Sequence, residues 1–291
     1  RQVTNAAFPN VIPLENQPSI AILKPGNLCN FACRTCNVEA TNQLYEIDYQ
    51  LRERPSGLLK DTDSVRATKE LTYENYVKTF DSQRNSFAKD SDFWKVMDSW
   101  SPNILHYALF GGEPFVMKPL FDMLNRSYEA GDSKKQDLYV STNASVWSEK
   151  YVEILKSFKS VMIGLSIDAV GDQFEYMRHP GKWEKIKANI LKFVQLRKEN
   201  PHIKLKVSAT CNPFNVYYLN ELYDFFKEVN VTIDIHLIQI PECYDIRILP
   251  QAVKDAVSEK HKDREDLAHV LRFLNSEMQN AELHLKDFIY V

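Results

Sequence analysis

Short apolar or alternating segments recur six times along the 291-residue chain, and amphipathic segments separate them. The predicted strands are Ser19–Lys24, Ile104–Phe110, Asp137–Asn143, Ser160–Asp168, Ile203–Asn212 and Val231–Ile240. Strands that alternate with helices form parallel sheets, because each crossover returns the chain to the same end of the sheet. We therefore predict an α/β fold, a partial (β/α)6 TIM-like barrel of parallel strands, whose functional site lies at the carboxyl ends of the strands.

The segments outside these six steps suggest how the chain is divided. Residues 1–18 form a predicted N-terminal extension, and a polar region over about 45–101 is interpreted as an insertion plus the first crossover helix, with a helical pattern over 71–87. After Ile240, two helical patterns over 250–266 and 267–285 follow each other with no strand between them. We predict a core over 19–240 and a helical C-terminal extension over 241–291.

Composition excludes several classes of function. The net charge is −3, so the chain offers no electrostatic basis for binding nucleic acid. No apolar run approaches the roughly 20 residues that a membrane span requires, and the polar N-terminal segment does not resemble a signal peptide. Five cysteines, an odd number, are not a disulfide framework. They indicate reduced thiols and a cytoplasmic location.

Cys29, Cys33 and Cys36 lie within eight residues, on the loop that leaves the first strand. Four thiolates normally bind the four irons of a [4Fe–4S] cluster, so three thiolates leave one iron open to another ligand. Zinc is an alternative, although structural zinc requires four protein ligands. Three unrelated core cysteines are a further alternative, but the neighbouring Asn30 and Arg34 are not core residues. We predict a [4Fe–4S] cluster here.

A second motif, Gly111-Gly112-Glu113-Pro114, follows the second strand about 75 residues after the cysteines. The two motifs together resemble those of the radical S-adenosylmethionine (radical SAM) superfamily, and the resemblance covers about residues 19–240. It implies that S-adenosylmethionine chelates the open iron, and that the reduced cluster splits it into methionine and a 5′-deoxyadenosyl radical. The radical then takes hydrogen from a substrate, so the resemblance implies an enzyme, an oxidoreductase or maturase.

The resemblance also implies roles for residues at the ends of the strands. Carbonyls of the glycine motif would accept hydrogen bonds from the methionyl ammonium group. Ser141 and Asn143 after the third strand, with Ser166 and Asp168 after the fourth, would bind the ribose hydroxyls and the methionyl carboxylate. Arg178 would pair with that carboxylate. Each of these residue types is also common in loops and helix caps, so ordinary structural roles remain open.

One position departs from the pattern of the superfamily. Many members carry an aromatic residue just before the last cysteine of the triplet, where this chain has Thr35, and Phe31 lies earlier in the loop. The residues that contact adenine are therefore left open.

The string LCNFACRTC together with GGEP is similar to members that carry SPASM or twitch extensions, many of which modify peptides. This similarity implies a peptide or protein substrate and an external electron donor such as flavodoxin or ferredoxin. Only Cys211 and Cys243 remain outside the triplet, too few to ligate an auxiliary cluster, so we predict a twitch-like extension without one. A radical enzyme that modifies nucleotides or small molecules, or a non-catalytic iron–sulfur protein, remains an alternative.

Cys211 and Cys243 follow the fifth and sixth predicted strands, which places them near the mouth of the predicted barrel. A thiol there could donate a hydrogen atom or bind substrate covalently, and two ordinary free cysteines are the alternative. His236, within the sixth strand, is expected to be packed or hydrogen-bonded rather than to act on a ligand.

Overall fold

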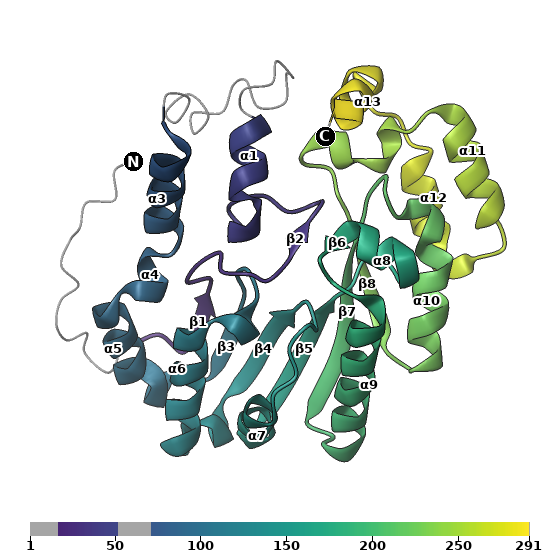
Figure 1. The fold of residues 1–291 in the computed structure, drawn as a ribbon. Helices are drawn as coiled ribbons and strands as arrows, with labels where there is room; N and C mark the ends of the chain where they lie inside the picture. Colours follow the sequence, from purple (N-terminus) through teal and green to yellow (C-terminus); the bar gives the residue numbers. More distant parts are fainter. Residues whose placement is uncertain (1–16, 52–70, 291) are drawn as a thin grey trace.

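The structure, a computed structural model, describes residues 17–51 and 71–290. Nearly all of the predicted N-terminal extension and part of the predicted insertion lie outside the described residues. Six parallel strands form one sheet in the order β1-β3-β4-β5-β7-β8, with β1 and β8 at its edges (Figure 1). These strands are β1 (Ile20–Leu23), β3 (His106–Leu109), β4 (Asp137–Thr142), β5 (Ser160–Ser166), β7 (Ile203–Cys211) and β8 (Thr232–Leu237). The predicted α/β class with six parallel strands is confirmed.

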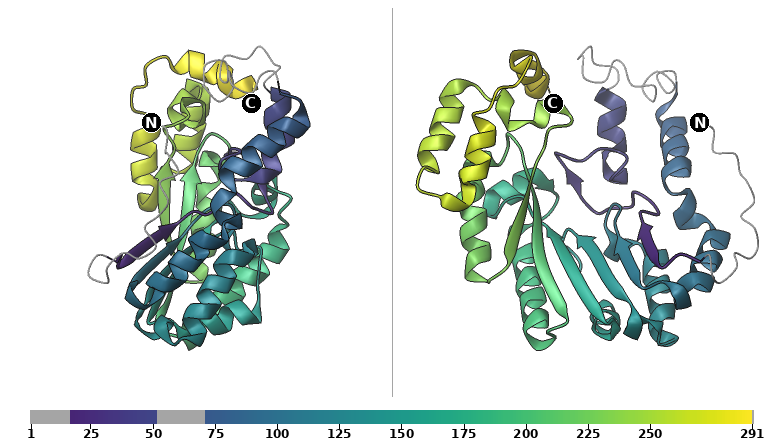
Figure 2. Two further views of the ribbon diagram at one scale, coloured as in Figure 1. Left: turned by 90° about the vertical axis from the view of Figure 1, so that its left-hand side faces the viewer. Right: turned by 180° about the vertical axis from the view of Figure 1, so that it is seen from behind.

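Side chains alternate between the two faces of the sheet. The odd-numbered residues of β7 are buried, whereas its even-numbered residues are exposed or half-buried. The buried face packs on helices that share one hydrophobic cluster with the strands, among them α6 (Lys118–Glu129), α7 (Glu149–Ser157), α9 (Trp183–Glu199) and α10 (Leu219–Glu228). From behind, no helix of the described residues crosses the other face (Figure 2). The sheet is therefore an open barrel wall with one apolar and one more polar face.

The region between β1 and β3 contains four α-helices among the described residues, at α1 (Tyr45–Leu51), α3 (Tyr73–Arg84), α4 (Ser86–Lys89) and α5 (Ser91–Trp100). α5 buries Trp94 and Met97 in the main cluster and is the crossover helix that packs on the sheet. α3 instead buries Tyr76 and Phe80 in a separate small cluster with Val38 and Tyr45. The insertion thus packs on the loop that carries the cysteines.

The C-terminal extension differs from the two predicted helices. It contains three 3₁₀ turns, η8 (Glu242–Tyr244), η9 (Ile246–Ile248) and η10 (Glu265–Leu267), and three α-helices, α11 (Gln251–Lys260), α12 (Ala268–Leu274) and α13 (Ala281–Tyr290). The pattern over 267–285 is split between α12 and α13, and Asn280 between them has a left-handed φ of 56°. α13 packs back on η8 and η9, at the carboxyl end of the sheet (Figure 1).

The expectation for His236 is wrong. Its side chain is 57% exposed and lies 3.7 Å from the Asp234 carboxylate. β8 is an edge strand with no fully buried residue, so the same alternation that suggested a packed histidine places it in solvent. Among the helices of residues 17–51 and 71–290, none has both the length and the apolar character needed to cross a bilayer.

Candidate active site at the carboxyl edge of the sheet

A two-stranded ribbon fixes the loop that carries the three cysteines. β2 (Ala32–Cys33) pairs antiparallel with β6 (Arg178–His179), and Cys33 lies directly opposite Arg178. The backbone N–H of Arg34 continues the pairing with a 2.9 Å hydrogen bond to the carbonyl of Met177. Two residues that are 145 positions apart in the sequence are therefore neighbours at the carboxyl edge of the sheet.

The three thiols lie among polar donors from other elements. The Arg178 Nη1 donates to the Cys33 Sγ at 4.0 Å, and the Asn143 Nδ2 donates to the Cys29 Sγ at 3.9 Å. Burial raises the pKa of the Cys29 thiol. A hydrogen bond between the thiols of Cys33 and Cys36 raises the pKa of Cys33 and lowers that of Cys36. The triplet is thus one interacting set.

The chemistry of this donor set fits an iron–sulfur cluster. In the described part of the chain, no group of three or more His, Cys, Asp or Glu side chains is arranged so that it could hold a single metal ion. A [4Fe–4S] cluster makes a different demand, since each thiolate binds a separate iron. The flanking guanidinium and amide donors suit the negative charge of a thiolate-ligated cluster, because hydrogen bonds to the sulfurs stabilise it.

Buried asparagines hold the cysteine loop, a feature that the sequence analysis missed. The backbone N–H of Asn27 donates to the Asn85 Oδ1 at 3.1 Å, and the Asn85 Nδ2 donates to the Asn27 Oδ1 at 2.9 Å. The Asn27 Nδ2 also donates to the Val38 carbonyl at 2.6 Å and to the Tyr45 hydroxyl at 3.0 Å. Asn85 lies between α3 and α4, so the insertion braces the start of the loop.

The two glycines of the second motif pack against this same loop. Gly111 has a φ of 113°, and a Cβ on Gly112 would lie 2.1 Å from the Leu28 carbonyl oxygen. The backbone N–H of Glu113 donates to that carbonyl at 2.8 Å. The close approach that requires glycine here is therefore between two segments of the protein.

We expect Gly112→Ala to displace the cysteine loop. A Cβ at 2.1 Å from a backbone oxygen cannot be accommodated by a side-chain rotation, so the backbone must shift. Overpacking of this kind costs about 1–3 kcal/mol of unfolding free energy, and the bound iron content should fall with it. Gly131→Ala is the control: its Cβ would meet no atom within 4 Å, although its φ of 80° adds strain. Equal iron content in both variants would contradict the expectation.

Glu113 lies beneath the site rather than on its surface. Its side chain is fully buried, and its carboxylate accepts hydrogen bonds from the Thr142 hydroxyl at 2.7 Å, the Asn143 N–H at 2.6 Å and the Phe115 N–H at 3.1 Å. Burial raises its pKa to about 7 against these three hydrogen bonds. Glu113 thus joins the loop after β3 to the end of β4. Pro114 follows it and opens a short 3₁₀ turn, Pro114–Val116.

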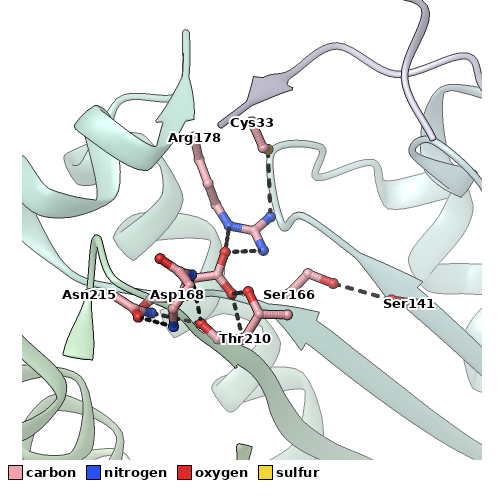
Figure 3. Close-up of polar contacts among 8 residues, drawn as sticks. Cys33, Ser141, Ser166, Asp168, Arg178, Thr210 and Asn215 are labelled. Carbon is pink, nitrogen blue, oxygen red and sulfur yellow. Dashed lines mark hydrogen bonds and ion pairs between the residues drawn. The ribbon is translucent and has the colours of Figure 1, made fainter. Parts of the chain in front are cut away.

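The predicted residues at the ends of β4 and β5 meet at this edge. The hydroxyls of Ser141 and Ser166 lie 3.2 Å apart on neighbouring strands (Figure 3). The Asn143 Nδ2 donates to the Asn30 Oδ1 at 3.0 Å, and the Asn30 Nδ2 donates to the Ser145 hydroxyl at 2.8 Å. Asn30 was not singled out from the sequence, although it stands inside the cysteine triplet.

Asp168 and Arg178 form a buried ion pair (Figure 3). The Arg178 Nε and Nη2 lie 2.9 and 2.8 Å from the Asp168 Oδ2, while the Asp168 Oδ1 accepts from the N–H and the hydroxyl of Thr210 at 2.8 and 2.9 Å. Burial opposes the charge of the guanidinium, but Asp168 and the thiols of Cys33 and Cys36 raise the pKa of Arg178 overall. The pair therefore links the ends of β5 and β7 to the cysteine loop.

The other two cysteines are buried. Cys211 is the last residue of β7 and only 1% exposed, and Cys243 in η8 is 3% exposed. Burial raises the pKa of Cys211, and it raises that of Cys243 to about 11. Both thiols are therefore protonated near neutral pH.

Known proteins of similar sequence include two curated relatives, although no family model matches this chain. The serine-type anaerobic sulfatase-maturating enzyme of Bacteroides thetaiotaomicron is 24% identical over 229 residues, which cover 77% of this chain and 46% of that protein. The radical SAM cyclopropyl synthase TigE of Paramaledivibacter caminithermalis is 23% identical over 206 residues, covering 71% of this chain and 38% of that protein. This chain thus spans less than half the length of both relatives.

A solved structure shares the fold. Native anSMEcpe with bound AdoMet and Kp18Cys peptide superposes with a TM-score of 0.50 at 14% identity, covering 87% of this chain and 62% of that one.

Proposed function

This chain belongs to the radical SAM superfamily, and from that premise we propose that it is an enzyme, a radical SAM oxidoreductase or maturase. The observation that carries the proposal is the pairing of β2 with β6. It brings Cys33 against Arg178 at the same edge of the sheet where Asn143 reaches Cys29. Thiols, amide and guanidinium from three separate parts of the chain are thereby gathered around one loop.

Cys29, Cys33 and Cys36 would hold the cluster in this proposal. When bound, a [4Fe–4S] cluster with S-adenosylmethionine on its open iron supplies the electron that yields methionine and a 5′-deoxyadenosyl radical able to abstract hydrogen. The Arg178 guanidinium would stabilise the negative charge near Cys33, and the Asn143 amide would do so near Cys29. Burial of Cys29 and Cys33 would limit the access of water to the ligands.

We propose that S-adenosylmethionine is bound by groups along the same edge. The backbone carbonyls of Gly111 and Gly112 can accept hydrogen bonds from an ammonium group, and the paired hydroxyls of Ser141 and Ser166 can bind ribose hydroxyls. Arg178 keeps N–H donors for a carboxylate, since a guanidinium offers five. For Glu113 and Pro114 we propose a supporting role, because the Glu113 carboxylate is committed to the end of β4.

Asp168 is also proposed to act indirectly. Its two carboxylate oxygens accept from Arg178 and Thr210, so its contribution is to hold the guanidinium in place. Cys211 and Cys243 remain proposed candidates for a hydrogen-atom donor. If Cys211→Ser or Cys243→Ser left product formation unchanged, the substituted cysteine would have only a packing role.

A peptide or protein side chain is the substrate class that we propose. The support is that one curated relative is named for sulfatase maturation and that the solved structure with the same fold holds a peptide. We further propose an external donor such as flavodoxin or ferredoxin, and a cytoplasmic setting in which the five free thiols stay reduced. We also propose that the chain divides into a core over 19–240 and a twitch-like extension over 241–291 without an auxiliary cluster.

Anaerobic reconstitution with iron and sulfide tests the proposed function without knowledge of the substrate. After addition of dithionite and S-adenosylmethionine, we expect 5′-deoxyadenosine and methionine to form in equal amounts from uncoupled turnover. A protein that takes up iron and sulfide but forms no 5′-deoxyadenosine would point to the non-catalytic alternative. Uptake of zinc but not of iron and sulfide would contradict the proposed iron–sulfur cluster.

A further inference from the structure

The C-terminal extension reaches into the cysteine triplet. The hydroxyl of Tyr244, in η8, donates a 2.9 Å hydrogen bond to the backbone carbonyl of Arg34, a residue 210 positions earlier in the chain. Arg34 stands between Cys33 and Cys36, and the N–H of Cys36 donates to the Cys33 carbonyl at 3.0 Å to close a turn around it. The hydroxyl therefore holds one peptide group of the very turn that spaces two of the three thiols.

The side chain of Arg34 is held by a different element. Its guanidinium carbon lies 4.1 Å from the centroid of the Tyr176 ring, and its Nε donates to the Tyr176 carbonyl at 3.0 Å. Tyr176 belongs to α8 (Gly171–Met177), the helix that leads directly into β6. The turn is thus held by contacts with both α8 and η8.

An aromatic side chain joins these two supports. Phe214, in the loop after β7, lies 6.0 Å from Tyr176 and 5.9 Å from Tyr244 between ring centroids. Phe288 of α13 packs on it at 5.0 Å. Arg34, Tyr176, Phe214 and Tyr244 therefore form a closed ring of contacts, which we term the rim latch. Four separate segments meet in it, and the extension supplies one of its four members.

We propose that Tyr244 is a positioning residue, through which the C-terminal extension fixes the Cys33–Cys36 turn and so tunes the reduction potential of the cluster. The proposal rests on the proposed function in that it takes the triplet to hold a cluster. Potentials of iron–sulfur clusters depend on nearby hydrogen bonds and on exposure to solvent. Loss of the Tyr244 hydrogen bond would free the carbonyl of Arg34, which would change both the hydrogen bonds and the solvent exposure near the cluster. Tyr244 is only 9% exposed, so its hydroxyl would meet little competing water.

Tyr244→Phe in the full chain tests the role of the hydroxyl, because it leaves the ring on Phe214. The control is Tyr218→Phe, whose ring packs on Tyr217 and Lys260 rather than on the cysteine turn. The first readout is amide hydrogen exchange over residues 30–38 in the apo-protein. We expect about fivefold faster exchange in Tyr244→Phe, the factor that the loss of one hydrogen bond of about 1 kcal/mol produces, and wild-type exchange in the control.

The second readout is the reconstituted cluster itself. We expect the midpoint potential and the electron paramagnetic resonance spectrum of the reduced cluster to shift in Tyr244→Phe, while Tyr218→Phe matches the wild type. Faster exchange with an unchanged potential would reduce Tyr244 to a structural contact and overturn the proposal, as would unchanged exchange. Thermal unfolding of both variants establishes that they are folded.

The two readouts separate this proposal from the proposed function. If the wild-type protein takes up no cluster, the proposed function fails, and the exchange measurement on the apo-protein still decides whether the extension orders the turn. If the wild-type cluster forms and cleaves S-adenosylmethionine but Tyr244→Phe is indistinguishable from it, only the rim latch is overturned.

Discussion

Alanine in place of any one of Cys29, Cys33 or Cys36 is expected to abolish the iron–sulfur absorption at roughly 400 nm or the cleavage of S-adenosylmethionine. The effect should be all-or-none. With three thiolates, one iron is open for the cosubstrate; with two, a second iron is left without a protein ligand. Loss of Cys33 also removes the thiol that lies beside Arg178. The measurements are absorption, iron content and 5′-deoxyadenosine formed after anaerobic reconstitution.

Cys243→Ala is the matched control, because Cys243 is buried as Cys29 and Cys33 are but lies outside the triplet. It should keep both the chromophore and cleavage, apart from the packing cost of a small cavity. In the wild type, exposure to air should bleach the absorption, since the open iron lacks a thiolate. A triplet variant that keeps both absorption and cleavage would be inconsistent with the ligand assignment, and an air-stable chromophore would indicate another kind of centre.

Local periodicity made the fold predictable. The hydrophobic periodicity of a strand or helix is visible within roughly five to ten residues. The alternation of strands and helices then leaves few possible topologies for a parallel sheet. The cysteine triplet and Gly111–Pro114 are equally local, so the position of the site along the chain could be read as well. The same argument explains the error at His236. Alternation in β8 looks the same whether the strand is central or, as here, at the edge of the sheet.

The contacts that hold the site in place join residues that are distant in the sequence, and no local sequence pattern predicts them. β2 and β6 are two residues long, too short to show any periodicity. Asn27 and Asn85 are 58 positions apart. Asparagine is a typical residue of surface loops, so its presence in the sequence does not indicate that these two side chains are buried against each other. Glu113 shows the limit most clearly. The string GGEP is identical whether the carboxylate faces a ligand or the interior, and only the packing of the loop against Leu28 decides.

Glu113→Ala is expected to destabilise the fold strongly, because it strands three buried donors at once. A buried donor without an acceptor costs about 1–3 kcal/mol, so the loss in unfolding free energy should be about 3 kcal/mol or more. Asn143 loses the bond that holds its backbone, so iron uptake should fall as well. Glu149→Ala, an exposed carboxylate that accepts from the Trp147 indole, should change the unfolding free energy by less than about 1 kcal/mol. Denaturant titration of both variants makes the comparison.

Glu113 should also make stability depend on pH in an unusual direction for a carboxylate. Its pKa is raised from 4.5 to about 7, chiefly by burial, so the folded protein binds this proton more tightly than the unfolded chain. The stabilisation is therefore complete below about pH 4.5 and is lost as the pH rises through about 7. Glu113→Gln keeps the shape without the titration, and the responses of all other groups cancel in the difference.

Between pH 5 and pH 8, we therefore expect the unfolding free energy of the wild type to fall relative to Glu113→Gln by about 2–3 kcal/mol, since one pKa unit corresponds to about 1.4 kcal/mol. The reason is the balance at the carboxylate: burial favours the neutral acid, while three donors favour the anion. A difference that is flat, or that grows with pH, would mean that the donors win and that Glu113 is an ordinary anion at neutral pH. In that case the end of β4 is held by a permanent buried charge.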